Sequence, residues 1–78
     1  MKNKMLRIIQ SDKFTKMTQE TQLLFMIMVQ YMDKNNQVHN SKAIMRIHGI
    51  KEISLEFLIG YGYLSRNAIF DDIYTLVI

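Results

Sequence analysis

Apolar side chains between residues 18 and 32 recur with the period of an α-helix and occupy two sides of it. The first stripe consists of Leu23, Leu24, Ile27, Met28 and Tyr31, and the second of Phe25, Met26, Val29 and Met32. This spacing predicts a helix that follows an N-cap at Thr18 and runs to about Met32. A helix that is apolar on two sides is central to its domain or shared with a partner. We expect a second chain to cover the second stripe, with flanking segments of the same chain as the alternative.

Short elements are predicted on either side of this helix. Residues 11–16 predict a helical turn that starts at Ser11 or Asp12 and is anchored to the core by Phe14 and Met17. The stretch DKNNQ, residues 33–37, predicts a turn, because Asp and Asn side chains bond to their own backbone. QVHN, residues 37–40, predicts a short strand.

The second half of the chain predicts two helices followed by two strands. Ser41 is expected to cap a helix that reaches about His48 and ends at Gly49, and its buried residues would be Ala43, Ile44 and Ile47. A second helix is predicted over residues 52–61, ended by Gly62, with Leu55, Leu58 and Ile59 buried. YLSRNAIF and IYTLVI are rich in β-formers, and Asp71 and Asp72 form the turn between them.

Two helices joined at a glycine and followed by a hairpin predict a winged helix-turn-helix, which is a mainly α fold with a small β-wing. We expect one domain over residues 1–78. Residues 1–10 are predicted to be a flexible or basic arm, and residues 63–78 the wing hairpin.

Composition and charge narrow the functional classes. The chain has 78 residues and no cysteine, which excludes disulfides and thiolate metal sites. Its longest apolar run, residues 23–29, is far shorter than the roughly 20 residues of a membrane span, so we expect no membrane contact and a cytoplasmic location. Residues 1–51 hold nine basic and three acidic side chains, whereas residues 52–78 hold one basic and four acidic ones. This asymmetry fits a modest nucleic-acid binder, and an ordinary solvated surface is the alternative.

The residue types that catalysis requires do not gather into any motif. His39 and His48 are isolated. Asp71 and Asp72 are an adjacent carboxylate pair, but in a strand they would point to opposite faces, and a turn is the better interpretation. The DKNNQ turn superficially resembles a calcium loop, but Val38 and Ile44 stand where Gly and Glu are needed. We therefore predict no enzyme, no metal, no cofactor and no small-molecule substrate.

A set of spaced residues resembles the amino-terminal domain of phage replisome organiser proteins. The set comprises Ser11, Asp12, Phe14 and Met17; Thr21, Gln22 and Leu24; Asp33; Val38 and Asn40; Ile44, Met45, Arg46 and Gly49; and Gly62, Tyr63 and Leu64. The register holds without a gap from Ser11 to Leu64. The resemblance implies a winged-helix domain from a phage or mobile element, acting inside a bacterial host, that binds origin DNA and helps to load the replicative helicase.

The chain departs from that family pattern in the second helix. Glu56 and Tyr61 stand where basic residues are usual, and Ile53 stands where a polar residue is usual. The family also continues past the wing into a region that engages replication partners, whereas the given sequence stops at residue 78.

Two functions remain open from the sequence. In the first, a dimeric winged helix binds duplex DNA in replication initiation or its control, with contacts from Asn40, Ser41, Lys42, Arg46, Lys51 and Arg66. In the second, the fold is an adaptor or inhibitor that docks on a host or phage replication protein, using exposed Ile53, paired Tyr61 and Tyr63, and the acidic second helix. The predicted partner or dimer interface comprises Phe25, Met26, Val29, Met32, Ile53 and Tyr61. An ion pair of Arg46 with Glu52 or Glu56 is the structural alternative to its DNA contact.

Overall fold

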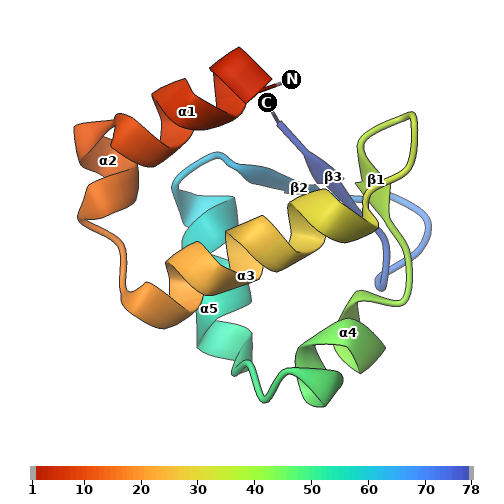
Figure 1. Cartoon of the computed structure of the whole chain (residues 1–78). Coiled ribbons are helices and arrows are strands. Elements are labelled where there is room, and N and C mark those ends of the chain that lie inside the picture. The colour runs from red at the N-terminus through yellow and green to blue at the C-terminus, as the bar shows by residue number, and fades with distance from the viewer. Residues whose placement is uncertain (1, 78) are drawn as a thin grey trace.

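The computed structural model describes residues 2–77, with side chains from Leu6 onward, and it is mainly helical with one small antiparallel sheet (Figure 1). The described elements are α1 (Lys2–Gln10), α2 (Asp12–Thr15), α3 (Gln19–Tyr31), β1 (Gln37–Val38), α4 (Ser41–Ile47), α5 (Glu52–Gly60), β2 (Leu64–Arg66) and β3 (Tyr74–Leu76). Met1, the first residue of the predicted arm, and Ile78, the last residue of the predicted hairpin, lie outside the described residues.

Local hydrogen bonds start α2 and α3 where the sequence predicts. The Ser11 hydroxyl accepts the amide of Phe14 at 3.2 Å, and the Thr18 hydroxyl accepts the amide of Thr21 at 3.2 Å. Each bond satisfies an amide that has no partner inside its own helix. Both predicted N-caps are therefore confirmed, as is the main helix after Thr18.

The helix α3 lies at the centre of the core. Leu24, Phe25 and Met28 have no exposed surface, and the Phe25 ring contacts Phe14 and Tyr63 with centroid distances of 5.5 and 5.4 Å. Such aromatic contacts add stabilisation beyond the apolar area that they bury. Phe14 and Met17 are buried as predicted, whereas Tyr63, which was expected on an exposed docking surface, belongs to the core.

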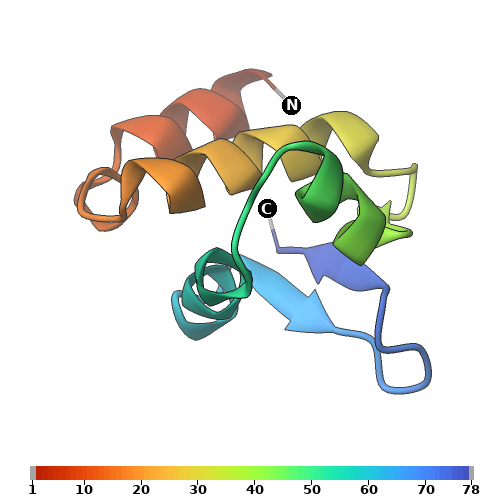
Figure 2. The same cartoon turned by 90° about the horizontal axis from the view of Figure 1, so that it is seen from below.

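The second stripe of α3 is partly buried within the chain itself. Figure 2 shows α1 and α3 side by side as one layer, with α5 and the β2–β3 hairpin on the other side. Ile8 and Ile9 of α1 pack against the core, as do the half-buried Met26, Val29 and Met32. Two predictions are corrected here. Phe25 is completely buried and cannot form an interface between chains, and residues 2–10 form a helix, anchored through Ile8 and Ile9, rather than a flexible arm.

Two residues of the first stripe were also assigned wrongly to the core. Leu23 and Tyr31 are about half exposed, whereas Ile27 between them is buried. The apolar residues of α3 extend around more of the helix than the core can cover, so those at the edge remain in contact with solvent.

The sheet brings the first strand and the hairpin together. Its order is β1-β3-β2, with antiparallel pairs such as Gln37 with Thr75 and Leu64 with Leu76. The strand predicted at QVHN forms at Gln37 and Val38 only, and it joins the hairpin in a three-stranded sheet. The hairpin strands are shorter than the predicted runs, because residues 67–73 form the connecting loop.

The predicted turn before β1 is organised by Asp33. Its Oδ1 accepts the amides of Asn35 at 2.8 Å and Gln37 at 3.0 Å, and Asn36 adopts φ +61°. The hydrogen bond from the Gln37 amide is the main reason that the pKa of Asp33 lies below its usual value, because the bond favours the ionised carboxylate.

The start of α4 differs from the prediction. Ser41 is buried inside the first turn and its hydroxyl donates to the Val38 carbonyl at 3.2 Å, so it is not the N-cap. Asn40 occupies that position with φ +56°, without a side-chain cap. This start directs Ile44 and Met45 into the core and leaves Ala43 and Ile47 exposed, which corrects their predicted burial.

The two glycines that were predicted to end helices have positive φ angles. Gly49 follows α4 with φ +67° and Gly62 follows α5 with φ +85°, a conformation that favours glycine. Leu55 and Leu58 of α5 are buried as predicted, whereas Ile59 is half-buried.

Candidate interaction surface on α4, α5 and the hairpin

Two carboxylates from distant parts of the chain hold α4 and α5 in place. Asp72, in the hairpin loop, accepts the backbone amide of Lys42 at 2.8 Å. Glu20, on α3, accepts the amide of Lys51 at 2.8 Å and the hydroxyl of Ser54 at 3.3 Å. Each acid therefore satisfies an otherwise free amide at a helix start, where the helix dipole also favours a negative charge. Together they fix α4 to the hairpin and α5 to α3.

The exposed side of α5 carries an acidic row and an apolar row. Glu52 and Glu56 form the first row, one helical turn apart. The second row runs along the next strip of the helix through Ile53, Phe57 and Tyr61, whose exposed fractions are 55%, 42% and 36%. Phe57 was not singled out from the sequence, although its spacing of four from both Ile53 and Tyr61 was a usable signal.

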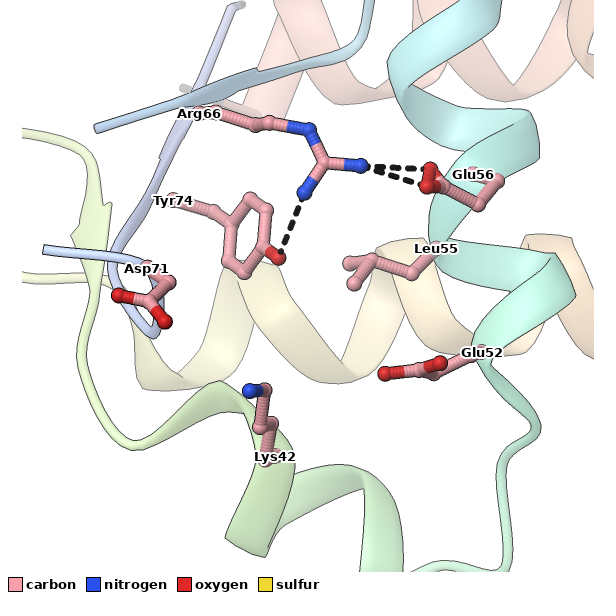
Figure 3. Close-up of a pocket in the computed structure, with 7 residues that line it drawn as sticks. All are labelled: Lys42, Glu52, Leu55, Glu56, Arg66, Asp71 and Tyr74. Carbon is pink, nitrogen blue, oxygen red and sulfur yellow. Dashed lines mark hydrogen bonds and ion pairs between the residues drawn. The ribbon is translucent and has the colours of Figure 1, made fainter. Parts of the chain in front are cut away.

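Arg66 of the hairpin is engaged by the acidic row. One guanidinium nitrogen donates to both carboxylate oxygens of Glu56 at 2.5 and 2.7 Å, and the other donates to the Tyr74 hydroxyl at 3.4 Å (Figure 3). Both charged side chains are about half exposed, so water weakens their attraction. Within the residues whose side chains are described, Arg46 forms no ion pair, and Glu56 pairs with Arg66 instead.

A hollow of about 130 Å³ lies between α4, α5 and the hairpin (Figure 3). Three carboxylates (Glu52, Glu56 and Asp71) and two cations (Lys42 and Arg66) line it, together with Leu55 and Tyr74. Its walls therefore carry slightly more negative than positive charge. A second, shallower hollow of about 300 Å³ adjoins it between α4 and the start of α5, where Lys42 and Arg46 face Glu52.

The structure separates the residues that were predicted to contact DNA. Asn40, Lys42, Arg46 and Lys51 are exposed around α4 and the turn that follows it. Arg66 is exposed but paired with Glu56. Ser41 is completely buried, so its predicted contact with DNA is wrong.

The predicted interface residues are also divided. Ile53 and Tyr61 lie together on the exposed side of α5, whereas Met26, Val29 and Met32 are half-buried against the core. Among the described side chains, no three His, Asp or Glu residues come together as a metal site.

A scan against models of protein families finds no match for the chain, and searches of curated proteins and of solved structures find no significant match either. The resemblance to replisome organisers therefore rests on the sequence pattern alone. Within residues 2–77, no helix has both the length and the apolar character needed to cross a bilayer.

Proposed function

We propose that the chain is a winged-helix module that binds duplex DNA mainly through the phosphate backbone. The order α3, β1, α4, α5, β2, β3 supports this proposal, because β1 joins the hairpin in one sheet and α4 and α5 are adjacent helices joined by a short turn. The resemblance to replisome organisers favours the same class of fold and a role in replication initiation or its control.

The exposed cations of α4 carry the proposal. Lys42 and Arg46 are one helical turn apart on its exposed side, and within the described residues neither forms an ion pair. In a helix-turn-helix the first helix crosses the DNA backbone, which is the position that α4 would take. Lys51, at the start of α5, is the third available cation.

The exposed side of α5 limits what kind of DNA binding the module could achieve. Glu56 engages Arg66, and Glu52 adds a further negative charge at the position where a recognition helix would enter the major groove. A glutamate can accept a bond from cytosine, but each one opposes the phosphate field. We therefore expect weak binding with little sequence preference.

Salt dependence gives a direct test of this backbone binding. Three phosphate contacts predict that the association constant falls about 40-fold between 50 and 200 mM salt. Fluorescence anisotropy with a labelled duplex measures this slope. The variant Lys42→Ala/Arg46→Ala should bind about tenfold more weakly, or worse, and with a shallower slope.

A charge-matched control distinguishes DNA binding at the α4 cations from a general attraction of DNA to the positive charge of the chain. Lys16→Ala/Lys34→Ala removes the same net charge from the C-cap of α2 and from the turn before β1, away from α4. This control should change the affinity only a few-fold. Absence of binding at 50 mM salt, or an equal loss in both double variants, would refute the proposed role of α4.

A further inference from the structure

We propose that the exposed side of α5 docks a protein helix that carries an apolar row beside a row of lysine or arginine. The apolar part of this surface is the row Ile53, Phe57 and Tyr61, which we call the α5 ridge. Single exposed apolar residues are ordinary on protein surfaces. The α5 ridge is different, because three large side chains continue along one strip of a single helix.

The α5 ridge lies outside the buried core, although the chain itself covers more than half of Phe57 and Tyr61. Leu55 and Leu58, on the opposite side of α5, supply the core contacts of this helix and are 4% and 0% exposed. Beside the ridge, a hollow of about 230 Å³ is bounded by Phe57 and Tyr61 on one side and by Lys16, Met17 and Thr18 on the other. This hollow has the size and partly apolar lining to receive one side chain of a docked helix.

The charges that flank the α5 ridge specify the partner. Glu52 and Glu56 lie along the side of the ridge that faces α4 and the hairpin, and Lys16 lies beyond Phe57 and Tyr61. A complementary helix therefore places basic side chains next to its apolar row, on the side that meets the two glutamates. Charge complementarity of this kind selects partners and orients them. Glu52 forms no ion pair among the described side chains and repels phosphate, whereas Glu56 already shares its carboxylate with Arg66. The surface therefore favours a basic protein segment over a nucleic acid chiefly through Glu52.

The geometry of the ridge favours a helix over an extended strand. Side chains four residues apart form the ridges that fit into the grooves of a neighbouring helix. The recognition of an amphipathic helix by such a surface uses anchors at the same helical spacing. The α5 ridge offers three of these anchors over nine residues, which matches two turns of a bound helix.

Two synthetic peptides test the proposal. Both are helical and carry leucines at helical spacing, and they differ only in whether the neighbouring row is lysine or glutamate. Amide chemical-shift titration of the full chain should map the lysine peptide to residues 52–61. The lysine peptide should bind about tenfold more tightly than the glutamate peptide.

Surface variants make the test specific. Phe57→Asp should abolish binding of the lysine peptide, and Glu52→Lys/Glu56→Lys should reverse the preference between the two peptides. Ile69→Asp is the matched control, because Ile69 is 81% exposed on the hairpin loop, and it should bind like the unchanged chain. Thermal unfolding confirms that each variant is folded.

Several outcomes would overturn the proposal: equal binding of the two peptides, binding that maps away from residues 52–61, or the same loss in Ile69→Asp as in Phe57→Asp. Sedimentation of the chain alone tests a further outcome. Self-association that Phe57→Asp abolishes would identify a second copy as the occupant and would also refute the proposed partner. DNA binding by the α4 cations should persist in Phe57→Asp, so the two proposals can fail separately.

Discussion

The exposed sides of α4 and α5 have the same layout but opposite charge. On α4, Lys42 and Arg46 form a charged row beside Ala43 and Ile47. On α5, the acidic row Glu52 and Glu56 lies beside the α5 ridge. The two helices are neighbours joined by residues 48–51, and each is capped by an acid from elsewhere in the chain. One scaffold thus presents two adjacent surfaces of opposite charge, for which we propose different ligands, and this is why function must be argued from surfaces and not from fold alone.

The largest expected effect tests whether the two helices depend equally on their distant caps. Asp72→Ala removes the acceptor for the Lys42 amide, and Glu20→Ala removes the acceptor for Lys51 and Ser54. Each change should lower the free energy of unfolding by about 1–2 kcal/mol, the usual cost of losing an N-cap. Urea denaturation followed by circular dichroism measures this.

Conservative controls accompany the two cap variants. Asp71→Ala removes the neighbouring carboxylate, which makes no cap, and Glu20→Gln keeps an acceptor oxygen in place. Both controls should remain near the stability of the unchanged chain. If Asp71→Ala costs as much as Asp72→Ala, the bond to the Lys42 amide does not account for the effect.

A smaller effect comes from changing the acidic row of α5 alone. Glu56→Gln removes a negative charge and releases Arg66 from its ion pair, so one more cation becomes available to DNA. We expect the affinity for duplex DNA to rise about fivefold, and the slope of log affinity against log salt to steepen by about 1. Stability should change by less than about 1 kcal/mol, because both partners are half exposed.

A second substitution isolates the contribution of the released arginine. Glu56→Gln/Arg66→Gln should lose the steeper salt slope. Anisotropy titration at several salt concentrations measures both variants. An unchanged slope in Glu56→Gln would mean that Arg66 is not reached by DNA, and the proposed binding surface would then be confined to α4 and its turn.

The smallest effect concerns the turn that leads through β1 into α4. Because the pKa of Asp33 is lowered in the folded chain, its ionised form adds stability that is complete above the ordinary aspartate pKa of about 4. This stability is lost as the pH falls through the lowered value. In thermal unfolding, the stability of Asp33→Asn should depend less on pH in that acid range than the stability of the unchanged chain. Above that range, the two proteins should show the same pH dependence. An identical acid profile in both proteins would remove Asp33 from this role.

Local signals in the sequence predicted much of the fold. The caps at Ser11 and Thr18 and the positive φ angles of Gly49 and Gly62 depend on residues within a few positions, and they were predicted correctly. The start of α4 was predicted incorrectly because its cap comes from Asp72, 30 residues away. A serine placed before an apolar run looks like a cap, but Ser41 is buried in the first turn and the Lys42 amide bonds to the distant carboxylate instead.

The candidate surfaces were only partly predictable for the same reason. The sequence predicted that Lys42, Arg46, Ile53 and Tyr61 are exposed. It did not predict that Glu56 pairs with Arg66, because Arg66 reaches Glu56 only after β2 has paired with β3 in the sheet. For the second stripe of α3, the sequence left two alternatives open, which were a second chain and flanking segments of the same chain. No residue inside α3 itself indicates that α1 packs beside it.

The position of β3 in the sheet has a consequence for biosynthesis. Of the described elements it leaves the ribosome after all others, yet it is the middle strand and the hydrogen-bonding partner of both β1 and β2. Until residues 74–76 emerge, those two strands have exposed edges and nothing to pair with, and such unpaired edges invite misassembly in a nascent chain. Helices can form early during translation, but the sheet can close only after residues 74–76 have emerged.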